Sequence, residues 1–226
     1  MNILYEDNHI IAVNKQPSEI SQSDKTGDIS LLDKTKKHIK LKYNKPGNVF
    51  LGLCHRLDRP VSGVILFAKT SKCLSRLNNI IKEKKIKKEY WAIVKNKPKE
   101  EKKSLINYIK KNSKHNKSYI HENKVPNSKI AILEYSIIHK LKNYYLLKII
   151  LETGRSHQIR TQLSYINCPI KGDVKYGFDR ANKDRSIHLH ARSVCFEHPV
   201  TKKRIKIICP TPNETIWNEC EKLKLN

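Results

Sequence analysis

A polar stretch at residues 55–63 lies between two apolar runs and constrains the chain more than any other feature. The run before it, residues 49–54, and the run after it, residues 64–68, have the composition of short buried strands. Burying an unpaired charge is costly, so the ionisable side chains of the polar stretch belong on a loop that partners or water can reach. Pro60 fixes one backbone angle and Gly63 admits unusual ones, so the sequence predicts a loop of defined shape.

Asp58 is the acid of this loop and stands between Arg56 and Arg59. Coulomb attraction from two guanidinium groups is expected to hold its carboxylate ionised. An ion-paired connection between two strands, without any chemical role, would explain the same residues. The loop taken alone leaves both interpretations open.

The stretch resembles the signature of the RluA-type RNA pseudouridine synthases, which reads His-Arg-Leu-Asp, two variable residues, Thr-Ser-Gly and an apolar strand ending in Ala-Lys. The match covers residues 55–69, with Val61 at the position of the usual threonine. In that family the aspartate of the motif is catalytic, and it maps onto Asp58. The resemblance further implies that His55 and Arg56 bind the RNA substrate, with Arg56 stabilising a uridine flipped out of its stem.

A second segment, residues 151–160, is similar to the same family almost residue for residue. The second arginine of that family motif pairs with the catalytic aspartate. The resemblance therefore implies that Arg160 acts together with Asp58. Arg155 and His157 of the segment are expected to bind the substrate RNA.

Residues 88–90 fit the Lys-x-Tyr with which the family begins a strand, and the family tyrosine lies against the target base. This implies an active-site role for Tyr90, although an aromatic residue in a strand is more often part of the core. Residues 171–177 and 188–192 resemble two further family segments, and the first is interpreted as a loop that supports the cleft. Near the N-terminus the family's Asn-Lys-Pro pattern is displaced by one residue, which weakens a substrate role for Lys15.

The chain is strongly basic, with 46 Lys and Arg against 21 Asp and Glu and a formal charge of +25. Such an excess repels itself in a compact protein and indicates a polyanionic partner, with nucleic acid first. Coding bias toward lysine would account for part of the same excess. The composition therefore favours RNA as the partner but does not separate an RNA-modifying enzyme from an RNA-binding protein.

Metal and cofactor motifs are sparse. The six cysteines form no Cys-x-x-Cys pair, and His188 and His190 lack an evident third ligand. A Gly-rich phosphate loop is also missing, so we expect neither a metal nor a cofactor. Because the sequence shows neither a membrane-length apolar run nor a signal-peptide pattern, we expect a cytoplasmic monomer without a membrane partner.

Hairpins interrupted by single helices predict an α+β fold, with a curved, largely antiparallel sheet flanked by helices and an active-site cleft over it. The resemblance implies the pseudouridine synthase fold in one catalytic domain, residues 1–226, without a separate N-terminal RNA-binding domain. Residues 96–129 are interpreted as mobile loops that could contact RNA, with a weak strand at 118–120. Helices are expected at 31–41, 72–85, 159–166 and 214–223, and strands at 3–5, 10–13, 89–94, 132–138, 144–151, 193–196 and 205–209.

The predicted activity is isomerisation of a uridine in tRNA or large-subunit ribosomal RNA to pseudouridine. Asp58 can attack the sugar as a nucleophile or remove a ribose proton, and the residues leave both routes open. A nucleoside glycosidase would use similar carboxylates but release free uracil. A non-catalytic RNA-binding or ribosome-associated protein would explain the charge but not the set Asp58, Tyr90 and Arg160.

Overall fold

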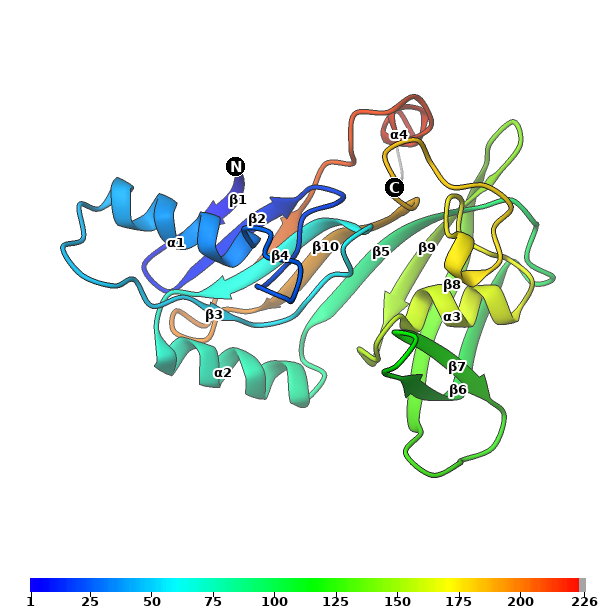
Figure 1. Cartoon of the computed structure of the whole chain (residues 1–226), viewed down its shortest axis with the longest axis horizontal. Helices are drawn as coiled ribbons and strands as arrows, with labels where there is room; N and C mark the ends of the chain where they lie inside the picture. The colour runs from blue at the N-terminus through cyan, green and yellow to red at the C-terminus, as the bar shows by residue number, and fades with distance from the viewer. Residues whose placement is uncertain (224–226) are drawn as a thin grey trace. The chain divides into compact units, whose positions relative to one another are not determined.

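The computed structural model describes residues 1–223 and has an α+β architecture (Figure 1). The chain forms two compact units. Unit 1 comprises Met1–Ile86 together with the chain from Ala191 onward, and unit 2 comprises Lys87–His190. In residues 1–223 no helix is long and apolar enough to cross a membrane.

The strands of unit 1 are built around two fully buried neighbours, β2 (Ile10–Lys15) and β4 (Ser62–Ala68). They pair antiparallel, with Ile10 opposite Ala68 and Lys15 opposite Gly63. Their continuous apolar sequences follow from burial on both faces. The other strands are β1 (Asn2–Glu6) beside β2, β3 (Gly52–Leu53) and β10 (Leu189–Glu197) beside β4, and β11 (Arg204–Ile208) beside β10; of β10, the residues from Ala191 belong to this unit.

Three helices belong to unit 1: α1 (Leu31–Lys42), α2 (Ser71–Lys82) and α4 (Thr215–Glu221). Helix α1 buries Leu31 and Ile39 in the core cluster that contains side chains of β2 and β4. The hydroxyl of Thr70 accepts a hydrogen bond from the backbone N–H of Cys73 at 3.1 Å and caps α2. The helix therefore begins at Ser71, one residue before the expected start at residue 72.

Unit 2 contains a five-strand arrangement in the order β5 (Lys87–Val94), β9 (Tyr145–Leu151), β8 (Lys129–Lys140), β6 (Lys102–Asn112) and β7 (Lys117–His121). Its strand ladders are antiparallel. Helix α3 (Gln158–Tyr165) packs on one face of the sheet, where Leu163 is fully buried and the Gln162 side-chain amide donates to the carbonyl of Leu105 at 3.2 Å. The short 3-10 helix η1 (Val174–Tyr176) follows.

Two expectations for strands were wrong. Residues 96–129 were interpreted as loops with a weak strand at 118–120; that strand forms as β7, but the longer β6 was not expected, and it forms because Leu105 and Ile109 bury one of its faces while lysines occupy exposed positions beside them. The apolar run at residues 49–54 was expected to be a strand, but only β3 forms there and Phe50 is exposed. Helix α2 also ends at Lys82, three residues before its predicted end.

Candidate active site

Asp58 lies in a tight turn at the N-terminal end of β4 in unit 1. The backbone N–H of Val61 donates to the carbonyl of Asp58 at 3.0 Å and closes the turn. The Asp58 side chain is half-buried. Gly63 is required where the turn enters β4, because its φ is +121° and a Cβ there would lie 2.4 Å from the carbonyl oxygen of Ala191.

The Ser21 hydroxyl binds both backbone polar groups of Leu57, the residue before Asp58. The Leu57 backbone N–H donates to Ser21 Oγ at 3.1 Å, and the same hydroxyl donates to the Leu57 carbonyl at 2.9 Å. Ser21 itself is buried. The polar segment after β2 therefore positions the backbone next to Asp58.

Lys15, the last residue of β2, fixes the other side of the turn. Its side chain is fully buried, and Nζ donates to the carbonyls of Val61 at 2.6 Å, Arg59 at 3.1 Å and Gln16 at 3.1 Å. The three donors of an ammonium match these three acceptors. Lys15 thus binds two carbonyls within the turn that carries Asp58.

Burial lowers the pKa of Lys15 to about 7. The negative charges of Glu19 and Asp58 oppose this shift, and the positive charge of Arg59 reinforces it. Desolvation disfavours the charged ammonium, so Lys15 titrates near neutral pH although its ordinary pKa is above 10.

Arg59 has partners that the sequence analysis did not consider. Its guanidinium donates to Asp28 at 2.6 Å and to the hydroxyl of Thr26 at 2.9 Å, and it lies 3.6 Å from the carboxylate of Asp24. The expectation that Arg59 serves Asp58 is therefore replaced by an ion pair with the acidic segment 24–28. Arg56, on the other side of Asp58, is exposed.

His55 accepts a hydrogen bond at Nε2 from the backbone N–H of Leu66 at 3.2 Å. This contact ties the start of the loop to β4. The ring is half-buried, so one nitrogen of a predicted RNA-binding residue already has a structural partner.

Arg160 lies in the first turn of α3 in unit 2 and is almost fully buried. Its Nε and Nη2 donate to the two carboxylate oxygens of Asp173 at 2.7 and 2.9 Å, a bidentate arrangement. The guanidinium carbon also lies 5.0 Å from the centre of the Tyr176 ring. Two residues of the segment 171–177 therefore orient Arg160.

The turn before α3 is held by one amide side chain. Gln158 Oε1 accepts from the hydroxyl of Thr153 at 2.8 Å and from the backbone N–H of Arg155 at 2.9 Å. The Arg155 guanidinium donates to the carbonyl of Ile130 at 2.8 Å. His157 has a φ of +55°, and its Nδ1 lies 2.8 Å from the hydroxyl of Tyr176.

Tyr90 lies on β5 of unit 2, opposite Ile149 of β9, and only 7% of it is exposed. Its neighbour Lys88 is also buried, and desolvation lowers the pKa of that ammonium. Side chains at alternate positions of a strand share a face, so Lys88 and Tyr90 lie on the same face of β5. This placement agrees with the core interpretation of Tyr90 as well as with the catalytic one.

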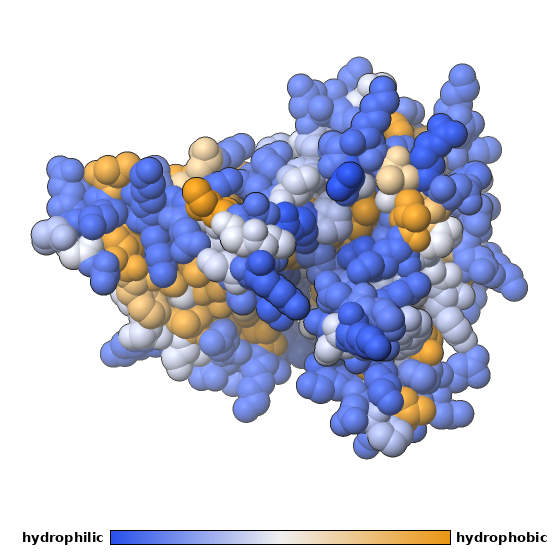
Figure 2. All heavy atoms as spheres, viewed as in Figure 1, coloured by the Kyte–Doolittle hydropathy of each residue, from blue (hydrophilic) through white to orange (hydrophobic). Residues whose placement is uncertain are grey.

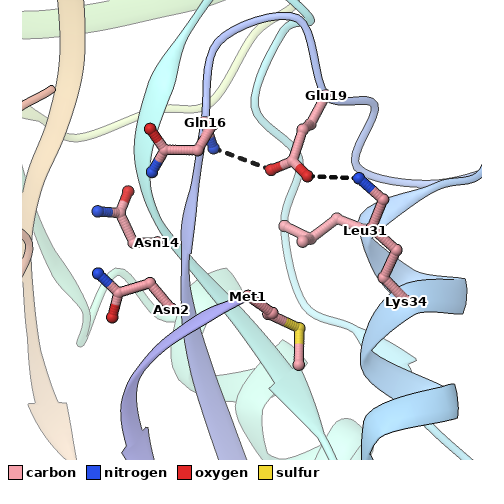
Figure 3. A pocket seen from close by; sticks show the side chains of 7 residues that line it. All are labelled: Met1, Asn2, Asn14, Gln16, Glu19, Leu31 and Lys34. Carbon is pink, nitrogen blue, oxygen red and sulfur yellow. Dashed lines mark hydrogen bonds and ion pairs between the residues drawn. The ribbon is translucent and has the colours of Figure 1, made fainter.

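A pocket of about 440 Å³ lies in unit 1 between the β1–β2 strands and the start of α1 (Figure 3). The Glu19 carboxylate accepts from the Gln16 backbone N–H at 3.0 Å and pairs with Lys34 at 2.7 Å. The other lining residues are Met1, Asn2, Asn14 and Leu31. None of the predicted site residues lines this pocket. Within residues 1–223, no group of three or more His, Cys, Asp or Glu side chains could hold a metal ion.

The family model described as RNA pseudouridylate synthase matches residues 9–165, a range that includes the Asp58 turn, Tyr90 and Arg160. The chain belongs to this family. The family membership that the sequence motifs indicated is therefore confirmed. Lys15 and Ser21, which hold the turn, also lie within the matched range.

Curated relatives in this family carry ribosomal names. The chain is 37% identical over 218 residues to ribosomal large subunit pseudouridine synthase C of Buchnera aphidicola subsp. Baizongia pistaciae (strain Bp), covering 92% of this chain and 66% of that protein. It is 33% identical over 216 residues to the protein of the same name from Rickettsia prowazekii (strain Madrid E), covering 93% and 68%. Synthase D of the same Buchnera strain is 34% identical over 217 residues, covering 89% and 66%. The chain spans about two thirds of the length of these relatives.

Two solved structures share the fold. The human RNA pseudouridylate synthase domain containing 4 protein aligns with a TM-score of 0.78 and 23% identity, covering 94% of this chain and 89% of that one. The corresponding domain containing 1 protein aligns with a TM-score of 0.74 and 23% identity, covering 97% and 86%. The predicted α+β class and pseudouridine synthase fold are confirmed.

The residues predicted for catalysis and RNA binding divide between the two units of this family member. Unit 1 holds His55, Arg56 and Asp58 on one loop, whereas unit 2 holds Tyr90 on β5 and Arg155, His157 and Arg160 around the start of α3. Sequence reasoning missed Lys15 and Ser21 as holders of the Asp58 turn. It also missed the bidentate partner Asp173, although the family segment that contains Asp173 was available as a signal.

Proposed function

We propose that this chain is an RNA pseudouridine synthase that isomerises a uridine in large-subunit ribosomal RNA. The reaction breaks the bond between ribose C1′ and uracil N1, turns the base and joins C1′ to C5. The proton leaves C5 and N1 gains one, so no electrons are gained or lost. The names of the curated relatives support ribosomal RNA as the substrate.

In this proposal Asp58 starts the reaction, either by attacking C1′ or by removing a ribose proton. Tyr90 stacks on the uracil and assists the loss of the C5 proton. Arg160 acts together with Asp58, as the family motif implies. Arg56, which is exposed, contacts the RNA from which the uridine has flipped, and His55, Arg155 and His157 contribute to RNA binding.

The observation that carries the proposal is the construction of the Asp58 turn. Lys15 and Ser21 bind the backbone on both sides of the aspartate, while Asp58 itself is only half-buried. A rigid backbone under an accessible carboxylate is what a positioned catalytic acid or nucleophile needs. A simple strand connection has no need for a fully buried lysine beneath it.

Charge supports RNA as the partner. The chain has a formal charge of +25, and hydrophilic residues cover most of the face drawn in Figure 2. Electrostatic attraction to phosphates raises the rate of encounter and gives most of the affinity that does not depend on sequence. We propose that the protein acts as a monomer in the cytoplasm, where ribosomal RNA is modified, with tRNA as the competing substrate.

The test replaces Asp58 by Asn, which keeps the size of the side chain and removes its charge. The purified variant is incubated with large-subunit ribosomal RNA and with tRNA transcripts, the RNA is digested, and nucleosides are separated by HPLC. We expect pseudouridine from the wild-type protein and none from Asp58→Asn, while RNA affinity stays within a few-fold. Glu197→Gln is the control, because it removes an exposed carboxylate of the same unit that pairs with the exposed Lys202, and it should leave turnover unchanged.

Other results would point to other functions. Near-wild-type turnover in Asp58→Asn would remove Asp58 from its catalytic role. Free uracil in place of pseudouridine would show a glycosidase. RNA binding without either product, in the wild-type protein, would show the non-catalytic alternative.

A further inference from the structure

Unit 2 has one sheet face that α3 covers and an opposite face with large exposed side chains. On β6, Leu105 and Ile109 point toward the α3 face and are buried, while Ile106 between them is 60% exposed. Tyr119 of β7 and Ile130 of β8 are 44% and 41% exposed. Successive side chains of a strand alternate between faces, so these exposed residues belong to the face away from the core.

The strand register joins these residues into one surface. Tyr108 of β6 lies opposite Ile130 of β8 on one side and opposite His121 of β7 on the other. The next residue of β6 on this face, Lys110, lies opposite Tyr119. We call the surface the β6–β8 outer face and define it by Ile106, Tyr108, Lys110, Lys117, Tyr119, His121 and Ile130.

The hairpin that carries most of this face has a single sign of charge. Residues 102–121 include six lysines and neither Asp nor Glu. A face that combines exposed aromatic rings with lysines matches the way proteins bind single-stranded RNA: bases stack on the rings and phosphates lie against the cations. Surfaces that bind another protein more often carry both signs of charge and fewer lysines.

The outer face is also continuous with residues around Arg160. Lys117 Nζ lies 5.7 Å from the centre of the Tyr119 ring and 5.4 Å from that of Tyr176. The Tyr176 hydroxyl accepts a hydrogen bond from the backbone N–H of Ser118 at 2.8 Å, and its ring packs against the Arg160 guanidinium at 5.0 Å. An RNA strand bound on Tyr119 would therefore run toward Arg160 within the same unit.

We infer that the β6–β8 outer face binds a single-stranded segment of the substrate RNA, with Tyr119 as the stacking platform and Lys110 and Lys117 as phosphate contacts. The inference rests on the proposed function, because it concerns RNA that flanks the modified uridine. Tyr119 acts on binding and not on the chemical step.

The binding experiment uses a fluorescein-labelled 12-nucleotide single-stranded RNA of mixed sequence and the duplex of the same strand, followed by fluorescence anisotropy. Stacking of one base contributes about 1–3 kcal/mol, so Tyr119→Ala should weaken binding of the single strand about five-fold to a hundred-fold, with a smaller effect on the duplex. Tyr119→Trp should keep the affinity. Tyr165→Ala is the matched control: this tyrosine of α3 is equally exposed, but its hydroxyl donates to Glu122 instead of lying among lysines.

Salt dependence separates the stacking contact from the ionic ones. Tyr119→Ala should leave the slope of log affinity against log salt unchanged, whereas Lys110→Ala should lower the slope by up to about one. With a transcript of large-subunit ribosomal RNA, Tyr119→Ala should raise KM and keep kcat at saturating RNA. If Tyr119→Ala fails to fold, Tyr119→Thr, which suits an exposed strand position, takes its place.

Unchanged single-strand affinity in the folded variant would overturn the inference. Unchanged RNA affinity together with loss of a dimer in sedimentation would instead assign the face to self-association, and it would overturn the inference equally. Failure of the proposed function looks different: the wild-type protein would bind RNA, yet no pseudouridine would form.

Discussion

Replacing Lys15 by Met keeps the length of the side chain and removes its charge and donors. The wild-type Nζ donates to three carbonyls, those of Gln16, Arg59 and Val61. The first two also accept backbone N–H groups, at 3.4 and 2.9 Å. The Val61 carbonyl accepts the shortest of the three hydrogen bonds, at 2.6 Å, and is the acceptor most affected by the loss of the ammonium donor.

The expected cost follows from that one carbonyl. A buried acceptor that loses its donor costs about 1–3 kcal/mol of stability. In a protein of this size each kcal/mol changes Tm by about 2–4 °C, so this cost corresponds to a Tm about 2–12 °C lower for Lys15→Met where the lysine is neutral in both the folded and the unfolded state. At lower pH the wild type has to deprotonate or bury the ammonium, a cost that the variant avoids, and this fully offsets the loss by neutral pH.

The pH dependence has a definite sign. The pKa of Lys15 is about 7 in the folded protein and 10.5 in its ordinary state. Below pH 7 the folded and unfolded states both carry the proton, so the stability difference between wild type and variant is flat. Between pH 7 and 10.5 the unfolded state binds more protons than the folded state, so the wild type gains on the variant by about 1.4 kcal/mol per pH unit.

The measurement is urea unfolding of wild type and Lys15→Met at pH 6, 7, 8 and 9. Lys34→Met is the control, because that ammonium is exposed and pairs with Glu19, and an exposed pair contributes less than about 1 kcal/mol. We expect the free energy of unfolding of the wild type to rise relative to that of Lys15→Met from pH 7 to pH 9, and the corresponding difference for the control to stay small. A constant difference for Lys15→Met would refute the reasoning, since Lys15 would then keep its proton throughout.

Four further results are expected. Tyr90→Phe should keep RNA binding but slow the late proton transfer, and Tyr90→Ala should lose more turnover; a fully active Tyr90→Ala would make this residue ordinary core. Asp173→Asn should lower stability in thermal unfolding because it removes the bidentate carboxylate that holds the buried Arg160, whereas Asp179→Asn, which breaks an exposed pair, should change it by less than about 1 kcal/mol. RNA affinity should fall about a thousand-fold or more between 50 and 200 mM salt if about 6–10 phosphates are contacted, and a flat titration would count against an RNA footprint. Single alanine substitutions should each lower that slope by about one or less without moving the modified uridine, at Lys82, Lys84, Lys85 or Lys87.

The central strands could be predicted because their signal is local. Residues 10–13 and 64–68 are continuous apolar runs, and both form strands whose side chains are fully buried. The shape of the Asp58 turn was also predictable from Pro60 and Gly63. The residues that hold the turn were not, because Lys15 and Ser21 bind backbone carbonyls and N–H groups that are 36 to 46 positions away in the sequence. Backbone groups are the same at every residue, so no sequence pattern marks them as partners.

Strand β6 was missed for a different reason, whereas the weak strand expected at 118–120 forms as β7. A strand with one solvated face needs apolar residues only at alternate positions, and in β6 only Leu105 and Ile109 are deeply buried. The remaining positions are rich in lysine, which is uncommon in strands and weakens the pattern. The pairing of β6 with both β7 and β8 compensates through backbone hydrogen bonds, which depend on the tertiary fold.

Arg160 shows how a residue can be identified correctly while its surroundings are not. The family motif marks it as a partner of Asp58, but within unit 2 its bidentate partner is Asp173. Burying a guanidinium requires a carboxylate with good geometry, and Asp173 meets that requirement independently of Asp58. The charge of Arg160 is therefore kept in place whether or not a substrate or Asp58 is beside it. A catalytic role is consequently best tested by Arg160→Lys with Asp173 intact: the positive charge remains, so a loss of turnover without loss of stability would assign the function to the fixed fork of the guanidinium rather than to its charge alone.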